Sequence, residues 1–354
     1  MTTQRRANII GLGLIGGSVG LALRERGWYV GGDDHDQGRI DRALQIGALD
    51  QQGLIETAEI TFVATPVLAA ADEVKRALAE TTGFVTDVGS VKGPITEAID
   101  DPRFVGGHPM AGSELEGLDG ADATMFTGAV WVLTPIVTTA DQTFAATASI
   151  VAELGAEVVA LQPGRHDQVV AVVSHVPHLA AATLMGVASE RAEEHGALLR
   201  LAAGGFRDMT RIASGHPGIW LDICAENREA ILDGLDGLIE GLRRMRDIVR
   251  DDDRAALHEI LRKAREARTN LPSRATQPNE LAEVRIPIPD RTGAAAEVFT
   301  LAAELGVNIS SFEVVHSVEG NRGVAIVLVD IQTVDLFRGG LLARGFRPAV
   351  QRLD

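Results

Sequence analysis

The chain has 354 residues, of which 45% are hydrophobic and 23% charged, a composition typical of a soluble globular protein with two or three domains. Its formal net charge of −16 argues against a nucleic-acid partner, and an anionic ligand would need local cations. The single cysteine, Cys224, excludes an intrachain disulfide. Because the first residues also lack the apolar core of a signal peptide, we expect a cytoplasmic protein.

A glycine-rich turn follows the first predicted strand. The segment "RRANIIGLGLIGGSVGLALRERG" predicts a strand and then a helix, with Gly11, Gly13 and Gly16 in G-x-G-x-x-G spacing between them. Such glycines allow a tight turn and bring the backbone close to a pyrophosphate at the helix N-terminus. We therefore expect a dinucleotide to bind here, with Leu14 and Ile15 of the same turn among its contacts.

An acidic residue ends the second predicted strand, "WYVGGDD". Asp33 lies about 20 positions after Gly13, where an acid accepts hydrogen bonds from the adenosine ribose and repels a 2′-phosphate. The sequence therefore favours NAD over NADP. Asp34 and Asp36 are close enough to be alternatives for this role.

Strands and helices alternate up to about residue 163, which predicts a doubly wound Rossmann-type sheet. Ligands bind beyond the carboxyl ends of strands in such sheets, and Thr65, Ser90 and His108 fall at such ends. The stretch "GGHPMAGSE" is poor material for helix or strand, so we expect His108 on a loop.

Helical patterns replace strand patterns over residues 164–271. The segment "RHDQVVAVVSHVPHLAAATLMGVASERAEE" predicts one long buried helix, not a membrane span, that carries Ser174, His175 and His178 and is kinked at Pro177. The two histidines are candidates for a site or for satisfied core residues. A metal site lacks a third ligand of suitable spacing, so we expect no metal.

The segment "GGFRDMTRIASGHPGIW" predicts Arg207 and Arg211 on one helix, with Asp208 between them. Arg211 is a candidate cation for an anionic substrate, and the alternative is a surface ion pair with Asp208. Trp220 could equally be a core residue. An all-helical domain of this kind commonly packs against a copy of itself, so a homodimer is plausible.

The remaining chain predicts a linker and a small third domain. "NLPSRATQPNE" has two prolines and no apolar periodicity, which indicates a linker over residues 272–280. Residues 281–354 predict the order βαββαβ, a ferredoxin-like α+β unit with its own core. The expected domains are therefore 1–163, 164–271 and 281–354, and the topology of the last decides nothing about function.

Taken together, the chain resembles the prephenate dehydrogenase family of tyrosine biosynthesis, with an ACT-like regulatory domain at the C-terminus. The resemblance rests on five motifs in order: "GLGLIGGSVG", "TDVGSVKG", "GGHPMAGSE", "VVSHVPH" and "GGFRDMTRIASGHPGIW". It implies an NAD-dependent oxidative decarboxylation of prephenate to 4-hydroxyphenylpyruvate. Hydride leaves C4 for NAD+, the 4-hydroxyl proton goes to a base, and carbon dioxide departs.

The resemblance also implies roles for single residues. His108 matches the catalytic histidine that accepts a hydrogen bond from the 4-hydroxyl, and Ser90 matches a serine that orients substrate and histidine. The expected substrate-binding group is His178, Arg211, Glu114, Ser174, Asp208 and Trp220, with Trp220 supplied across the dimer as one option. In the ACT-like domain, Gly293 of "DRTG" and Asn308 of "GVNI" match effector contacts, which implies feedback by tyrosine or by phenylalanine.

Three alternatives stay open at the sequence level. Arogenate dehydrogenase would use the same His108 and Ser90, because its substrate differs only in the side chain, where an amino acid replaces the pyruvyl group. A β-hydroxyacid dehydrogenase would need a catalytic lysine on the helical domain, where this chain has Arg211 and His178. A non-catalytic sensor of NAD or of an amino acid is the alternative from a different class.

Overall fold

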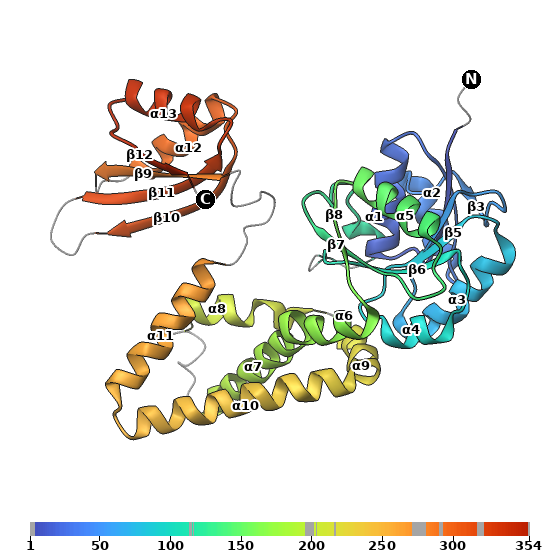
Figure 1. Ribbon diagram of the computed structural model, residues 1–354, viewed down its shortest axis with the longest axis horizontal. Helices are drawn as coiled ribbons and strands as arrows, with labels where there is room; N and C mark the ends of the chain where they lie inside the picture. Colours follow the sequence, from blue (N-terminus) through green and yellow to red (C-terminus); the bar gives the residue numbers. More distant parts are fainter. Residues whose placement is uncertain are drawn as a thin grey trace. The chain divides into compact units, whose positions relative to one another are not determined.

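The computed structural model describes residues 4–112, 115, 117–194, 202, 204–215, 217–270, 281–289, 293–316 and 322–352 (Figure 1). The chain divides into two compact units, residues 1–250 and 251–354. The predicted linker, 272–280, and the candidate site residue Glu114 lie outside the described residues.

The first unit begins with an eight-stranded sheet in the order β3-β2-β1-β4-β5-β6-β7-β8. The strands are β1 (Arg6–Ile10), β2 (Tyr29–Asp33), β3 (Gln51–Gln52), β4 (Ile60–Val63), β5 (Phe84–Asp87), β6 (Phe104–Pro109), β7 (Val130–Thr134) and β8 (Glu157–Ala160). The helices between them are α1 (Leu14–Glu25), α2 (Gln37–Ile46), α3 (Val67–Glu80), α4 (Gly93–Ala98) and α5 (Asp141–Glu153). The pairs joining β2, β1, β4, β5 and β6 are parallel, and β7 runs antiparallel to β6. The predicted Rossmann-type fold is confirmed.

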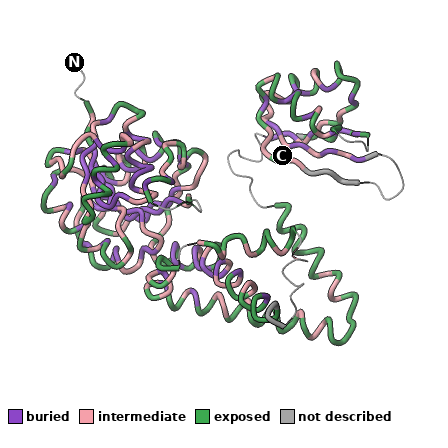
Figure 2. The backbone as a smooth tube through the Cα atoms, turned by 180° about the vertical axis from the view of Figure 1, so that it is seen from behind, coloured by how far each residue is buried: buried purple, intermediate pink, exposed green. Residues whose placement is uncertain are grey.

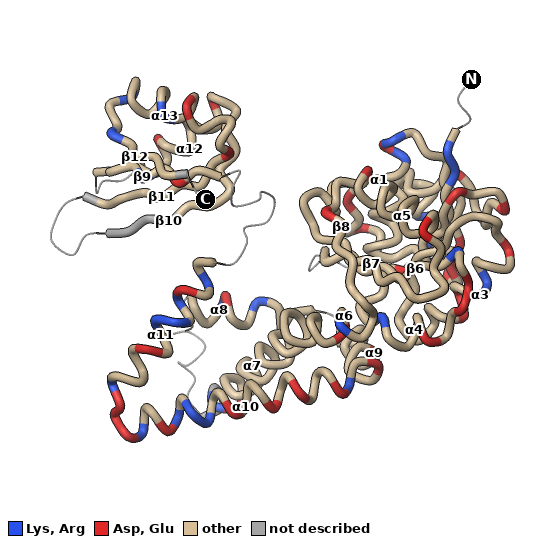
Figure 3. The backbone as a smooth tube through the Cα atoms, viewed as in Figure 1, with Lys and Arg blue, Asp and Glu red and all other residues tan. Residues whose placement is uncertain are grey.

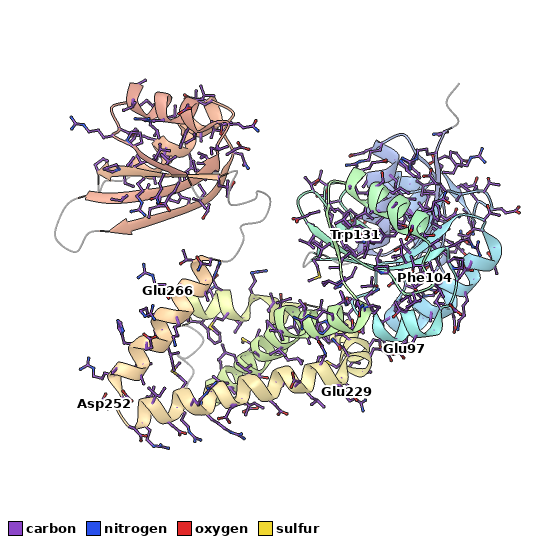
Figure 4. The ribbon with its side chains drawn as sticks, in the orientation of Figure 1. Glu97, Phe104, Trp131, Glu229, Asp252 and Glu266 are labelled. Atoms are coloured by element: carbon purple, nitrogen blue, oxygen red, sulfur yellow. The ribbon has the colours of Figure 1, made fainter. Side chains whose placement is uncertain are left out.

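Both faces of this sheet are covered, which explains the composition of its central strands. Every residue of β4, "ITFV", is buried, as expected for a parallel strand with helices on both sides. Trp131 of β7 packs edge-on against Phe62 and tilted against Phe126. Figure 2 shows the buried residues gathered in this part of the first unit, and Figure 4 labels Trp131 and Phe104 among them.

A helical segment follows β8. Its helices are α6 (Pro163–Val170), α7 (Val176–Glu194), α8 (Gly204–Thr210), α9 (Pro217–Glu226) and α10 (Arg228–Arg250). A π-helical turn, Ala171–His175, joins α6 to α7 just before Pro177. Proline lacks an N–H and clashes with the preceding turn, so the predicted disturbance is present as a π-turn. Arg211 lies in a 3-10 turn, Arg211–Ser214, so the prediction that it shares one helix with Arg207 is wrong.

The long helix is less buried than expected. Within the described residues, the stretch Pro163–Arg191 is long and apolar enough to cross a membrane by length and composition alone. Only 28% of its most apolar window is buried, so the prediction of a buried helix is wrong for the single chain. Val172 and Val173 are 61% and 60% exposed, whereas His166 and His175 face the interior.

The second unit contains α11 (Arg254–Thr269) and a four-stranded antiparallel sheet in the order β10-β11-β9-β12. Its strands are β9 (Leu281–Pro289), β10 (Ile309–His316), β11 (Arg322–Asp330) and β12 (Ala349–Arg352), with α12 (Ala294–Glu304) and α13 (Val334–Ala343) between them. Alternate residues of β9 are buried, such as Val284, Ile286 and Ile288, because the helices cover one face of the sheet. The predicted βαββαβ order is confirmed.

Candidate active site

The glycine loop between β1 and α1 leaves one side open. Gly11 has φ +94°, and a Cβ there would lie 2.5 Å from the carbonyl oxygen of Ala64. A Cβ at Gly16 would lie 2.0 Å from the oxygen of Gly11, so both positions require glycine for local packing. At Gly13 nothing lies within 4 Å, which leaves the room that close approach of a dinucleotide needs.

The other residues predicted to contact the cofactor surround this loop. Leu14 and Ile15 form the first turn of α1 and are half-buried. Thr65 lies on the loop after β4, and its backbone nitrogen would meet a Cβ at Gly11. Its hydroxyl oxygen is buried and has no hydrogen-bond partner within the described residues. Such an orphaned group beside an open glycine loop fits a ligand contact.

The acid that faces the glycine loop is Asp34, not Asp33. The Asp34 side chain is 2% exposed, and its Oδ2 accepts a 2.7 Å hydrogen bond from the backbone N–H of Leu12. Asp33 instead pairs with Arg76 of α3, at 3.0 Å. Asp36 accepts from Gly38 and caps α2. The assignment of Asp33 to the ribose stays a prediction: its side chain is 33% exposed, whereas the Asp34 side chain is enclosed against the loop.

His108 lies in a strand, so the prediction of a loop is wrong. It is the penultimate residue of β6, is paired with Val132 of β7 and is 8% exposed. The two glycines before it serve close packing within the sheet and do not make a turn. A Cβ at Gly106 would lie 2.4 Å from Thr134 Oγ1, and one at Gly107 would lie 2.6 Å from the oxygen of Asp87.

The imidazole of His108 is joined to a second histidine and a carboxylate. Its Nδ1 lies 2.9 Å from Nε2 of His166, and Nδ1 of His166 lies 2.7 Å from Oδ1 of Asp167. The Asp167 carboxylate also accepts from the backbone N–H groups of Lys92 and Gly93, at 2.8 and 2.7 Å. Sequence reasoning missed His166 and Asp167. The available signal was a polar run, "RHDQ", just before the apolar stretch "VVAVV".

The surroundings of His108 favour its neutral form. Burial is the main reason that its pKa lies well below the ordinary value of 6.5, and repulsion from His166, Lys92 and His175 acts in the same direction. At neutral pH the side chain is therefore an uncharged imidazole. A neutral imidazole can accept a proton, which is the form that a general base requires.

A buried ion pair holds the loop that carries Ser90. Lys92, fully buried, donates to Asp87 and also to the carbonyl oxygen of Gly107, at 2.8 Å. Asp87 accepts in turn from the N–H of Gly107, at 3.1 Å. The loop is thus fixed to the strand of His108. Ser90 is half-buried there, and no hydrogen bond joins it to His108 in the described part of the chain.

His178 and Trp220 are brought together within one chain. Their rings are stacked, with centroids 3.6 Å apart and an interplanar angle of 13°. His175 meets the same indole edge-on at 6.0 Å. Burial lowers the pKa of His178. This contact forms within one chain, so it does not require a Trp220 supplied by a partner subunit.

Three other residues predicted to bind the substrate lie outside the stacked pair that includes His178. Ser174 is half-buried in the π-helical turn, while Asp208 and Arg211 are exposed on α8 and on the following 3-10 turn. That 3-10 turn packs against α7, the helix of His178. A Cβ at Gly215, just after the turn, would lie 3.5 Å from the His178 ring. Arg211 and His178 therefore belong to neighbouring elements.

His175 occupies a second buried polar site. Its Nδ1 lies 3.2 Å from the side-chain nitrogen of Asn227, which also donates to the carbonyl oxygen of Asp167. Its Nε2 is buried without a hydrogen-bond partner among the described residues. Burial, opposed by the Asp167 carboxylate, lowers the pKa of His175 to about 4. His175 is therefore neutral, and Asn227, which lies between α9 and α10, joins it to the network around Asp167.

A hollow of about 1160 Å³ lies beside Asp167. It is lined by α4, α6, the π-turn and the junction of α9 and α10, with Glu97 and Glu229 at its wall (Figure 4). Of the predicted site residues in the described ranges, none lines it. Across those ranges, no group of three His, Cys, Asp or Glu side chains is placed to bind a metal.

In the second unit, the two candidate effector contacts lie apart. Gly293, with φ +89°, precedes α12, and Asn308 follows it and is exposed. The helix has 11 residues, so its ends are about 16 Å apart. A ligand of the size of an amino acid cannot touch both residues within one chain.

Comparisons with known proteins agree with this arrangement. A family model described as the nucleotide-binding domain of prephenate dehydrogenase matches residues 19–160, and one described as its dimerization domain matches residues 162–263. The prephenate dehydrogenase of Bacillus subtilis (strain 168) is 32% identical over 333 residues, which cover 89% of this chain and 90% of the relative.

Solved structures show the same relationship. The prephenate dehydrogenase from A. aeolicus in complex with hydroxyphenyl propionate and NAD+ has a TM-score of 0.71 and 28% identity, covering 76% of this chain and 99% of that one. The arogenate dehydrogenase from Synechocystis has a TM-score of 0.65 and 31% identity, covering 75% and 99%. With its glycine loop, its buried histidine and these matches, the chain belongs to the prephenate dehydrogenase family.

Proposed function

We propose that this enzyme oxidises and decarboxylates prephenate to 4-hydroxyphenylpyruvate and carbon dioxide, with NAD+ as hydride acceptor. The observation that carries the proposal is the buried, neutral His108 at the carboxyl end of β6, the sheet edge at which the glycine loop opens. A relative solved with NAD+ and hydroxyphenyl propionate supports both the cofactor and an aromatic ligand. Family membership removes the non-catalytic sensor from consideration.

His108 is the proposed base. NAD+, when bound, accepts hydride from C4 of the substrate. His108 takes the 4-hydroxyl proton as the C4–H bond breaks, and the proton returns to the ring oxygen when the carboxylate leaves C1 and the ring becomes aromatic. Ser90, on the loop fixed beside β6, is the proposed orienting hydroxyl. The balance of the reaction then requires no further oxidant and no net proton.

The proposed anion site combines Arg211 and His178. Prephenate carries two carboxylates, and a guanidinium binds a carboxylate through two parallel hydrogen bonds while staying charged. Trp220 holds the His178 ring by stacking, and Ser174, Asp208 and Glu114 complete the proposed substrate group. Local cations of this kind are needed because the chain as a whole carries a charge of −16.

Arogenate is the second candidate substrate. It shares the ring, the ring carboxylate and the 4-hydroxyl, so the proposed role of His108 applies equally. The Synechocystis arogenate dehydrogenase, at 31% identity, favours keeping this alternative. The preference between the two substrates depends on the residues that contact the substrate's side chain, which ends in a pyruvyl group in prephenate and carries an ammonium group in arogenate.

The test is NADH formation by the purified chain with NAD+ and either prephenate or arogenate. We expect turnover of prephenate, and His108→Asn lowers kcat by about 10²- to 10⁴-fold while NAD+ binding is kept. Turnover with arogenate alone would change the substrate and keep the chemistry. Turnover of neither substrate would overturn the proposed function.

We further propose a cytoplasmic homodimer in which tyrosine inhibits through the ACT-like domain. The match to a dimerization domain supports the dimer. The domains are proposed to be 1–163, 164–271 and 281–354, with a linker over 272–280. Since Gly293 and Asn308 lie at opposite ends of α12, an effector that contacts both would do so from two protomers. Gly293→Val should abolish inhibition by tyrosine with kcat retained, and unchanged inhibition would contradict this assignment.

A further inference from the structure

We propose that His166 and Asp167 are a positioning pair, which holds the His108 ring with its proton on Nδ1 and leaves Nε2 bare toward the substrate. The inference rests on the proposed function, because it gives His108 the role of a base. It assigns a task to two residues of the helical segment that the motifs did not single out. Neither residue needs to touch the substrate.

The direction of the hydrogen bonds follows from the Asp167 end. Its Oδ1 faces the backbone N–H of Lys92 at 2.8 Å, and its Oδ2 faces the N–H of Gly93 at 2.7 Å. Backbone N–H groups can only donate, so both oxygens act as acceptors, as in an ionised carboxylate. The third contact, 2.7 Å to Nδ1 of His166, must then be donated by His166.

The proton on His166 determines the proton on His108. In the proposed arrangement His166 carries one N–H, the Nδ1–H that donates to Asp167. Its Nε2 therefore has only a lone pair, and the His108 Nδ1 at 2.9 Å must donate to it. His108 then carries its hydrogen on Nδ1. Its other nitrogen, Nε2, is free to accept the proton of the 4-hydroxyl.

The same contacts stabilise His108 after it accepts the proton. The imidazolium would be 8% exposed and would lie near Lys92 and His175. Lys92 is paired with Asp87, which offsets its charge, and His175 is neutral. The hydrogen bond to His166, itself 0% exposed and bonded to Asp167, disperses the new charge without any group having to move.

The pair also connects two parts of the active site. Asp167 belongs to α6, whereas Lys92 and Gly93 begin α4 just after Ser90. One carboxylate therefore holds the ring that supports His108 and the loop that carries Ser90. We infer that loss of Asp167 disturbs both, whereas loss of the His166 ring nitrogen affects only the tautomer.

The tautomer can be measured without substrate. In protein labelled with ¹⁵N-histidine, the ring nitrogens of His108 are assigned among the nine histidines by comparison with His108→Asn. We expect the proton on Nδ1 in the wild type. In His166→Leu no acceptor faces His108 Nδ1, so the fraction of His108 that carries its proton on Nδ1 should fall. A wild-type His108 protonated on Nε2 would overturn the inference.

Kinetics distinguish a positioning role from a structural one. His166→Leu removes the acceptor and should lower kcat about 100-fold, with the KM for NAD+ unchanged within about threefold. His166→Gln offers a carbonyl oxygen to His108 Nδ1–H and should recover about tenfold of that loss. Equal rates for wild type and His166→Leu would overturn the pair. If the wild type oxidises neither substrate, the proposed function fails, and the spectrum still decides the tautomer.

Discussion

The buried imidazole of His108 has a consequence for the pH dependence of catalysis. A base acts in its deprotonated form, so activity is lost as pH falls through its pKa. Because burial and the neighbouring His166 and Lys92 lower that pKa, the acid limb of kcat/KM should lie below pH 6.5. The measurement is initial rate against pH at low substrate. A half-maximal point at or above 6.5 would show that another group, or a more exposed His108, controls the rate.

The acidic residue beside the glycine loop should decide between NAD and NADP. Asp33 is 33% exposed, whereas Asp34 is 2% exposed and already accepts from the N–H of Leu12, so Asp33 is the carboxylate that a ribose can reach. Asp33→Asn removes a charged acceptor worth about 1.5–3 kcal/mol, so the KM for NAD+ should rise about 10- to 100-fold, and discrimination against NADP+ should fall. Asp36→Asn is the matched control, because asparagine still caps α2, and it should change the KM for NAD+ less than about threefold. The reverse order of effects would move the ribose contact to Asp36.

At this scale the sequence predicts residue types better than partners. The motif around His108 is sufficient to single out the histidine, but it predicts a loop because Gly106 and Gly107 are residues that turns favour. Their true role, avoiding Thr134 and Asp87, depends on which strands become neighbours. The sequence does not single out His166 and Asp167 for the same reason, since their contacts with His108 and Lys92 join residues that are far apart in the sequence.

The loop between β5 and α4 is bonded to β6 through Lys92 and Asp87. We expect this buried ion pair to contribute strongly to the free energy of unfolding. Lys92→Met leaves Asp87 buried without its partner, which should lower the free energy of unfolding by about 3–5 kcal/mol. Urea unfolding followed by tryptophan fluorescence is suitable, because Trp28, Trp131 and Trp220 all lie in the first unit.

The control for that variant is Lys75→Met. Lys75 lies 3.9 Å from Asp72 at the surface and is 55% exposed, so its loss should cost less than about 1 kcal/mol. Similar losses for the two variants would mean that water reaches the Asp87–Lys92 pair and that it does not fix the loop.

Helices and strands with a regular apolar pattern can be predicted from the sequence, whereas local departures from regular backbone geometry cannot. The strands β1 and β4 and the helices α10 and α12 follow apolar patterns that the sequence displays directly. The π-turn before Pro177 was predicted only as a kink, because proline shows that a regular helix fails and does not show which backbone bonds replace it.

Across the whole molecule, the first unit exposes an apolar stripe that a second copy would cover. On α10, Leu232, Ile239, Leu242 and Val249 are 54%, 42%, 60% and 61% exposed. They recur at steps of seven, three and seven, the spacing of a helix seam. Figure 3 shows acidic residues along the first half of α10 and basic residues gathered toward its C-terminal end. Exposed apolar stripes of this kind are typical of oligomer interfaces, which agrees with the match to a dimerization domain.

Leu242→Asp should therefore dissociate the proposed dimer. In a symmetric interface the substitution occurs twice, and burying an unpaired carboxylate costs about 3 kcal/mol or more each time, so the dissociation constant should rise about 10⁴-fold. Light scattering after size exclusion should show twice 37.5 kDa for the wild type and 37.5 kDa for the variant. Val137→Asp is the matched control, because Val137 is 105% exposed on a loop of the Rossmann sheet and should leave the mass unchanged. A Leu242→Asp protein that stays dimeric would move the interface away from α10, and the exposed face of the helix with Val172 and Val173 would be the next surface to test.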